Sequence, residues 1–351
     1  MKVRTTLKLC AAGVALALAA TSGSALAQKR VKWKMQSAFG SSLPHLGTSG
    51  VRFSKNISEA TDGKFEIKFY EPGALVPALE CFDAASKGSV ESCWTTPGYH
   101  TGKLGTSVSF FTTVPFGPGF GEFMAWKIFG GGDKLRNELY AKHGLIAMTN
   151  FCIGPETSGW FKNEIKSLDQ LKGMKMRFFG LGAQVMQKLG VSTQLLAGGD
   201  IFPALELGTI DATEFSMPAI DLDLGFYQVA KHYYFPGWHQ QSTLFDLMMN
   251  KEKWDALSDT QKAQIEVTCG DNIREGLAEG EAIQGKALAE LKSKGVTIHK
   301  WSPEILDTLH KAWDETAMEL AAEDPNFKKA WDSLQAFRTE YAEWRKIGYL
   351  N

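Results

Sequence analysis

Apolar and polar side chains alternate along two short segments near the start of the chain. Residues 31–36 and 64–70 change character at every second position, which predicts strands with one buried face. Between them, a loop rich in Gly, Ser and Pro precedes a helix expected at about 46–61. A strand, a helix and a strand within about forty residues predict an α/β layer with parallel neighbouring strands.

The same order of elements recurs further along the chain. A predicted helix at 77–86 ends at Gly88 and is followed by a strand at 90–95. A second helix, expected at 201–207 with Asp200 as its cap, ends at Gly208 before a strand at 209–215. Between these units, Ser167 and Gln170 form a capping box ahead of a strand at 174–178. The repetition predicts two similarly built lobes.

Helical spacing dominates the chain after residue 250. Helices are predicted at 254–292 and 303–322, and the Asp324-Pro325 pair precedes a last helix at 328–344. An apolar stripe at three- and four-residue spacing runs along this last segment: Phe327, Trp331, Leu334, Phe337, Tyr341 and Trp344. The stripe predicts a buried face, which covers either the protein's own lobes or a second copy in a homodimer.

The first 27 residues have the pattern of a secretory signal peptide. Lys2, Arg4 and Lys8 precede an apolar run at 9–20, and Ala25-Leu26-Ala27 is a small-x-small cleavage pattern. We expect cleavage after Ala27 and a periplasmic protein, because the run is shorter than the ~20 residues that span a bilayer. Removing these three positive charges takes the formal net charge from −1 to −4.

Composition narrows the class of partner. Hydrophobic residues make up 44% and charged residues 22%, as in soluble globular proteins. The 38 Lys and Arg form no basic cluster and are balanced by 39 acids, so nucleic acid is excluded as a partner. Outside the signal peptide, Cys81, Cys93, Cys152 and Cys269 match no zinc motif. We expect them to be buried small hydrophobes, with a Cys81–Cys93 disulfide as the alternative.

Familiar catalytic motifs are missing from the sequence. The turn that begins at Arg177 has Gly180 and Gly182, but Val185 stands where a dinucleotide-binding motif needs its third glycine. The sequence contains no phosphate-binding loop, nucleophile elbow or His-Glu-x-x-His pair. His239 lies in an aromatic run and is expected to be a hydrogen-bonded structural histidine rather than a ligand.

Four polar residues stand at or beyond the expected ends of strands: Glu156, Arg177, Glu214 and Gln240. Ligands of open α/β sheets bind outside the carboxyl ends of strands, so these residues are candidates for a binding crevice. An Arg can hold a carboxylate with two parallel hydrogen bonds. Carboxylate and amide oxygens suit sodium or calcium better than zinc or copper.

Several longer motifs resemble one family. They are the segment from Ser167 to Arg177 (Ser-Leu-Asp-Gln-Leu-Lys-Gly-Met-Lys-Met-Arg), Ala-Leu-Glu-Leu-Gly-Thr-Ile-Asp-Ala-Thr-Glu at 204–214, Tyr-Tyr-Phe-Pro-Gly-Trp-His at 233–239 and Phe-Arg-Thr-Glu-Tyr-Ala-Glu-Trp-Arg-Lys at 337–346. With these motifs, the chain from about residue 31 to 350 resembles the DctP-type periplasmic solute-binding proteins of TRAP transporters, and most of all their 2-oxo acid binding branch.

The resemblance implies roles for individual residues. Arg177 is expected to pair with the substrate carboxylate, and Glu156 to contact both substrate and cation. Glu214, Gln240 and the carbonyl of Phe215 are implied cation ligands, and Phe215 also borders the substrate. The branch usually has Gln at position 156, Trp at 215 and Glu at 240, so Gln and Glu have changed places in this chain.

The resemblance also implies an α/β, two-lobed periplasmic-binding-protein fold with a hinge cleft and long C-terminal helices. We expect lobe I at 28–152 and 241–280, and lobe II at 153–240 and 281–351. The implied function is a non-catalytic receptor that captures a small organic acid, with sodium or calcium, and delivers it to the TRAP membrane permease. A periplasmic enzyme acting on a similar acid and a carboxylate sensor are the alternatives.

Overall fold

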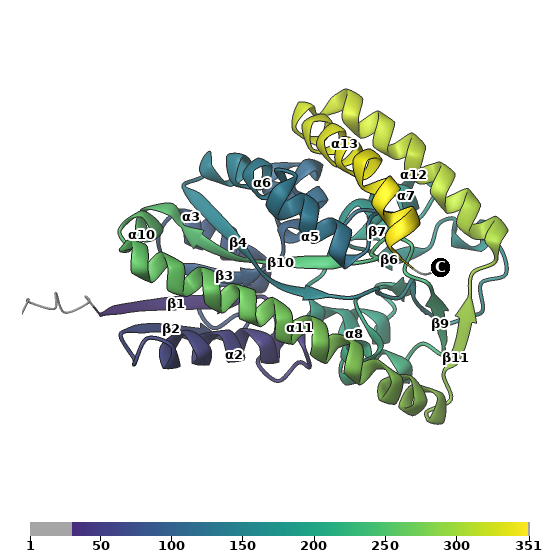
Figure 1. The fold of residues 1–351 in the computed structure, drawn as a ribbon. Coiled ribbons are helices and arrows are strands. Elements are labelled where there is room, and N and C mark those ends of the chain that lie inside the picture. The colour runs from purple at the N-terminus through teal and green to yellow at the C-terminus, as the bar shows by residue number, and fades with distance from the viewer. Residues whose placement is uncertain (1–29, 350–351) are drawn as a thin grey trace, which may run out of the picture.

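Two β-sheets form the centre of the molecule in the computed structural model, which describes residues 30–349 (Figure 1). The expected signal peptide and its cleavage site lie outside the described residues. The first sheet has the order β2-β1-β3-β10-β4, and the second has the order β11-β9-β5-β8-β6-β7. The mixed α/β fold with two lobes, each built on one sheet, agrees with the expected class.

The first sheet begins as the alternation predicts. It contains β1 (Val31–Ser37), β2 (Phe65–Tyr70), β3 (Ser92–Thr95), β4 (Leu145–Ile153) and β10 (Thr243–Asn250). β1 pairs in parallel with β2 and β3, whereas β10 runs antiparallel between β3 and β4. We did not predict β10, because all eight of its residues are buried and the strand therefore shows no alternation.

The second sheet contains shorter strands. They are β5 (Gly159–Phe161), β6 (Lys175–Arg177), β7 (Ser192–Gln194), β8 (Ala212–Thr213), β9 (His232–Phe235) and β11 (Thr297–Lys300). β6 lies between β7 and β8 and runs parallel to both. β5 is antiparallel to β8 and β9. The carboxyl ends of β6 and β8 therefore meet at one edge of the sheet.

Helices cover both sheets. They are α2 (Leu46–Glu59), α3 (Cys81–Ser86), α4 (Thr101–Leu104), α5 (Phe120–Phe129), α6 (Gly132–Ala141), α7 (Gly180–Lys188), α8 (Gly198–Glu206), α9 (Pro218–Asp223), α10 (Lys251–Asp255), α11 (Asp259–Ser293), α12 (Pro303–Glu323) and α13 (Pro325–Gly348). Among residues 30–349, none of the helices has both the length and the apolar character needed to cross a membrane.

The repeated unit ends as expected but starts differently. Gly88 after α3 and Gly208 after α8 have φ angles of 73° and 72°, a conformation that favours glycine at the end of a helix. The expected cap of α8 is wrong: the helix begins at Gly198, and Asp200 lies in its first turn. Two consecutive glycines look like a loop in the sequence, yet here they adopt helical backbone.

α11 is the longest helix and joins the two halves of the molecule. Its 35 residues correspond to about 50 Å at 1.5 Å per residue. It packs on β4 and α2 beside the first sheet and on α9 beside the second, and its course is visible in Figure 1. The expected boundary between residues 280 and 281 falls inside this continuous helix, and the lobe boundaries as a whole stay a prediction.

The C-terminal stripe packs largely on the protein itself. α13 contacts α5, α6 and the short 3-10 helix η3 (Thr106–Phe111), and α12 contacts α7. Phe327 and Leu334 are fully buried, whereas Trp344 is 55% exposed. The protein's own lobes therefore cover the beginning of the stripe, and its end remains at the surface.

The expectation that all four cysteines are unpaired is wrong for two of them. Cys81, at the start of α3, and Cys93, in β3, form a disulfide across a Cα–Cα distance of 6.1 Å. The packing of α3 on β3 brings the two residues together, which sequence spacing alone does not reveal. Cys152 and Cys269 are buried free thiols, as expected.

Candidate functional site

The four polar residues predicted to form a site lie close together. Two stand at strand ends of the second sheet, and the other two stand in the segments that connect the two sheets. Arg177 ends β6, and Glu214 follows β8 directly. Because Arg177 is paired with Thr213 in the parallel register, Glu214 lies next to it. Glu156 lies between β4 and β5, and Gln240 lies between β9 and β10.

Main-chain contacts hold the last two residues side by side. The amide of Glu156 donates to the carbonyl of Gln240 across 3.0 Å, and the amide of Gly237 donates to the carbonyl of Glu156 across 3.0 Å. A Cβ atom at position 237 would lie 2.4 Å from that carbonyl oxygen. A glycine is therefore needed for the 236–240 turn to wrap around Glu156.

Arg177 and Glu214 form a fully buried ion pair. Arg177 Nη1 lies 2.6 Å from Glu214 Oε1 and also donates to the Glu214 carbonyl across 2.9 Å. The amide of Phe179 donates to the same Oε1 across 2.6 Å. These bonds fix the guanidinium in place before any ligand arrives, which lowers the ordering cost of binding.

Glu156 and Gln240 form a second buried pair. Gln240 Nε2 donates to Glu156 Oε1 across 2.7 Å and to the Thr243 hydroxyl across 2.7 Å. The Thr243 hydroxyl donates to Glu156 Oε1 across 2.9 Å. The two positions at which the family resemblance implies an exchange of Gln and Glu are therefore in direct contact.

Three buried carboxylate and amide oxygens at the site lack a hydrogen bond: Glu156 Oε2, Glu214 Oε2 and Gln240 Oε1. Unpartnered buried oxygens are costly unless a ligand or ion satisfies them. Carboxylate and amide oxygens are the donors that sodium and calcium prefer. The donor set therefore fits a hard cation.

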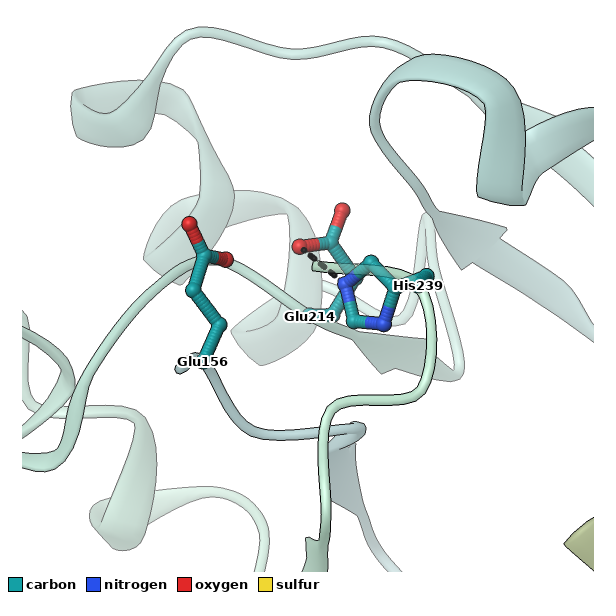
Figure 2. Close-up of side chains that lie close together, drawn as sticks. All are labelled: Glu156, Glu214 and His239. Carbon is teal, nitrogen blue, oxygen red and sulfur yellow. Dashed lines mark ion pairs between the residues drawn. The ribbon is translucent and has the colours of Figure 1, made fainter. Parts of the chain in front are cut away.

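His239 also belongs to this cluster. Its Nε2 lies 3.5 Å from Glu214 Oε2, and one ligand atom from each of His239, Glu156 and Glu214 lies within 4.8 Å of the others. Figure 2 shows the imidazole facing the Glu214 carboxylate, with Glu156 beside them. Neither ring nitrogen of this buried histidine has a well-formed hydrogen bond. The turn after β9 places the ring against Glu214, and the expected structural role of His239 stays a prediction.

The two carboxyl groups have opposite electrostatic environments. Burial, together with the charge of Glu214, raises the pKa of Glu156 well above its usual value. Burial also acts to raise the pKa of Glu214, but Arg177, His239 and the Phe179 amide together hold it below its usual value. Burial therefore disfavours the charged form of Glu156, and a cation beside it would offset that cost.

A small cavity lies against these groups. It is lined by Phe39, Leu46, Thr96, Tyr99, Glu156, Arg177, Phe179, Phe215, Ser216, Gln240, Thr243 and Phe245. Glu156, Arg177 and Gln240 supply polar groups to the lining, and Phe39, Leu46 and Phe245 supply apolar surface. The Phe215 ring lies 5.1 Å from the Arg177 guanidinium carbon, within cation–π range.

Residues from both lobes border this cavity. Tyr99, which lies after β3 of the first sheet, lines the cavity together with Arg177, and burial raises the pKa of its hydroxyl to about 12. The hydroxyl therefore stays protonated as a hydrogen-bond donor. Tyr99 was not among the residues predicted from the sequence. The candidates were polar residues at the ends of predicted strands, and an aromatic side chain does not meet that criterion.

The structure thus brings together Glu156, Arg177, Glu214, Phe215 and Gln240, all five residues that the sequence singled out. Four of them line the cavity, and Glu214 lies beside it through Arg177. Their individual roles toward substrate and cation stay predictions.

A family model decides what kind of protein carries this site. The model described as "Bacterial extracellular solute-binding protein, family 7", or DctP, matches residues 38–324. The chain belongs to the DctP family. Members of this family are extracytoplasmic receptors that bind solutes, and the resemblance found in the sequence motifs is confirmed.

Individual DctP relatives extend along nearly the whole chain. A monocarboxylate 2-oxoacid-binding periplasmic protein of Nostoc is 35% identical over 322 residues, which cover 92% of this chain and 88% of the relative. A TRAP transporter solute-binding protein of Bordetella bronchiseptica, solved with calcium and picolinate, is 35% identical with a TM-score of 0.88, covering 91% and 95% of the two chains.

A third DctP relative was solved with a different acid. The TRAP solute-binding protein of Colwellia psychrerythraea, with bound calcium and pyruvate, is 30% identical with a TM-score of 0.86 and covers 91% of this chain and 97% of its own. Its superposition confirms the two-lobed fold.

Proposed function

We propose that this protein is a periplasmic TRAP receptor that captures a short 2-oxo or 2-hydroxy monocarboxylate together with sodium or calcium. The observation that carries the proposal is the juxtaposition of Arg177 with three buried carboxylate and amide oxygens that lack a hydrogen bond, beside a small cavity that Arg177 lines. The charges of an acid and a cation bound there would neutralise each other. The cation would also be coordinated by the three oxygens. The relatives bind such pairs: calcium with pyruvate and calcium with picolinate.

The charge of the lining favours a monocarboxylate. Arg177 is the one Lys or Arg among the described residues that line the cavity, and it already faces Glu214. A second carboxylate on the ligand would lie against Phe39, Leu46 or Phe245 without a partner, which is costly in a buried site. A single carboxylate at Arg177 with an apolar body matches the lining.

Capture rather than turnover is the role that this site supports. The lobes close by a hinge over the acid, and the closed form docks on the TRAP permease. Signal-peptide cleavage after Ala27 delivers the chain to the periplasm. Arg177 pairs with the carboxylate and Glu156 contacts acid and cation, while Glu214, Gln240 and the Phe215 carbonyl hold the cation.

A thermal-shift and calorimetry screen tests the proposal. Protein dialysed against a chelator is titrated with pyruvate, lactate and 2-oxobutanoate, with and without sodium or calcium. We expect a ligand-dependent rise in Tm that is larger when the cation is present, because a ligand that binds only the folded state stabilises it.

Two control ligands sharpen that screen. Pyruvamide has nearly the shape of pyruvate without its charge, and succinate adds a second carboxylate; neither should raise Tm comparably. Equal responses to pyruvate and pyruvamide would contradict the role of Arg177. Turnover of the acid in the same samples would favour an enzyme instead.

A further inference from the structure

A second, larger cavity lies next to the binding cavity. It is bordered by stretches at 38–43, 71–78, 197–200 and 223–224. Glu71, Asp200 and Asp223 on its border are exposed. This outer cavity therefore opens to solvent, unlike the small inner cavity at Arg177.

Phe39 lines both cavities. Its side chain is only 3% exposed and packs edge-on against Phe245, with ring centroids 5.7 Å apart, and against Tyr99 at 5.9 Å. The Phe215 ring lines the inner cavity and lies against Gly198, which borders the outer cavity, since a Cβ atom at Gly198 would lie 2.7 Å from that ring. The wall between the cavities is thus made of packed aromatic rings.

The backbone at Phe39 is held independently of its ring. The amide of Phe39 donates to Ser37 Oγ across 3.0 Å, and the Ser37 hydroxyl donates to the carbonyl of Phe39 across 2.7 Å. Shortening the side chain therefore removes the wall without releasing the segment that carries it.

The chemistry of the outer cavity differs from that of the polar groups in the inner cavity. Its charged border groups are acids, Glu71, Asp200 and Asp223, and none of the described residues that border it is a Lys or Arg. Apolar residues such as Leu43 and Leu224 line the rest. An aliphatic chain would be accepted there, whereas a second carboxylate would be repelled.

We propose that Phe39 sets the chain length of the acid by closing the inner cavity toward the outer cavity. This inference rests on the proposed function. With the carboxylate held at Arg177, a ligand body that extends toward the outer cavity meets the Phe39 ring, which lines both cavities. The natural ligand is then a short-chain acid such as pyruvate, and removal of the ring opens a path into the outer cavity.

Calorimetry of the full mature chain in saturating calcium tests the role of Phe39. The probes are pyruvate and 2-oxooctanoate, which have the same head group and different chain lengths. We expect the wild type to prefer pyruvate. In Phe39→Ala the affinity ratio should shift toward 2-oxooctanoate by ~10-fold or more, since each newly buried methylene contributes about fourfold.

Three controls accompany this experiment. Leu43→Ala shortens a buried side chain that borders only the outer cavity, so the ratio should stay at the wild-type value. 2-Oxoadipate, a longer acid with a second carboxylate, should gain nothing in Phe39→Ala. If Phe39→Ala does not fold, Phe39→Leu should shift the ratio in the same direction by a smaller factor.

The outcomes separate the two claims. A wild type that binds pyruvate, with an unchanged ratio in the folded Phe39 variants, overturns the role of Phe39 and leaves the receptor function standing. A wild type that binds 2-oxooctanoate as tightly as pyruvate also overturns the role of Phe39 and leaves the receptor function standing. A wild type that binds neither acid overturns the proposed function and this inference with it.

Discussion

The side-chain amide of Gln240 donates a hydrogen bond to the carboxylate of Glu156 across 2.7 Å. The family resemblance implies that Gln and Glu have changed places at these two positions. Because the two side chains are in direct contact, the exchange can be compensatory. In either arrangement one carboxylate and one amide line the same cavity. The charge of the pair is kept, and only the position of the negative group moves.

Exchange variants at these positions should show compensation. Glu156→Gln removes one of the proposed carboxylate ligands of the cation. The affinities for the cation and for the acid should both fall by ~10-fold or more, because two unit charges ~4 Å apart interact by roughly 4 kcal/mol at an effective dielectric near 20. Gln240→Glu should shift the preference toward a divalent ion. The double variant should recover much of both affinities by calorimetry with sodium and calcium. A double variant no tighter than the worse single variant would show that the positions act independently.

Arg177→Ala should abolish acid binding and also lower stability. The ligand carboxylate would lose its partner, a loss of roughly 3 to 5 kcal/mol in binding free energy. Glu214 would at the same time be left buried without the charge that now lies 2.6 Å away, so Tm should fall.

Adding Glu214→Gln to the Arg177 variant separates these two effects. The double variant should regain Tm, because the uncompensated buried charge is gone, but it should still bind no acid. Near-normal affinity for the acid in either variant would show that Arg177 does not bind the acid. Calorimetry and thermal unfolding measure the two readouts independently.

His100 should make the fold sensitive to acid. Burial lowers its pKa from the ordinary value of 6.5 to about 3. The unfolded chain therefore takes up this proton near pH 6.5 while the folded protein does not, so stability is lost as the pH falls below 6.5. The loss is at most about 1.4 kcal/mol per pH unit for one proton.

Denaturant unfolding between pH 5 and 7.5 measures this slope. His100→Leu places an apolar side chain among Phe82 and Tyr140 and should flatten the dependence of the unfolding free energy on pH. His310→Gln, at an exposed position, is the matched control and should behave as the wild type. The same slope in His100→Leu as in the wild type would rule out this histidine as the source.

Self-association is expected through the exposed end of α13. Trp344 and Ile347 are 55% and 71% exposed, and apolar side chains of this size gain by burial against a second copy. Light scattering over a range of concentrations should give a dimer mass for the wild type and a lower mass for a Trp344→Ala/Ile347→Ala variant. Deleting the whole helix would be uninformative, because Phe327 and Leu334 belong to the protein's own core. A monomer mass for the wild type at every concentration would end the dimer prediction.

Local patterns in the sequence determined the elements with one exposed face and the residues at strand ends. β1 and β2 alternate because one side of each faces more polar surroundings, and α12 and α13 follow from their apolar spacing. Arg177 and Glu214 could be selected because each stands at the end of a predicted strand. The family resemblance then supplied roles that spacing alone could not assign.

Only the tertiary structure decided the features that depend on which segments meet. β10 is buried on both faces and so carries no periodic signal, and Cys81 meets Cys93 only once α3 has packed on β3. His239 and Tyr99 enter the site from different lobes, and Phe39 divides two cavities that exist only between the lobes. Hydrophobic patterning acts over a few neighbouring residues, whereas a binding cavity is made by residues far apart in the chain, and their proximity is set by sheet register and lobe packing.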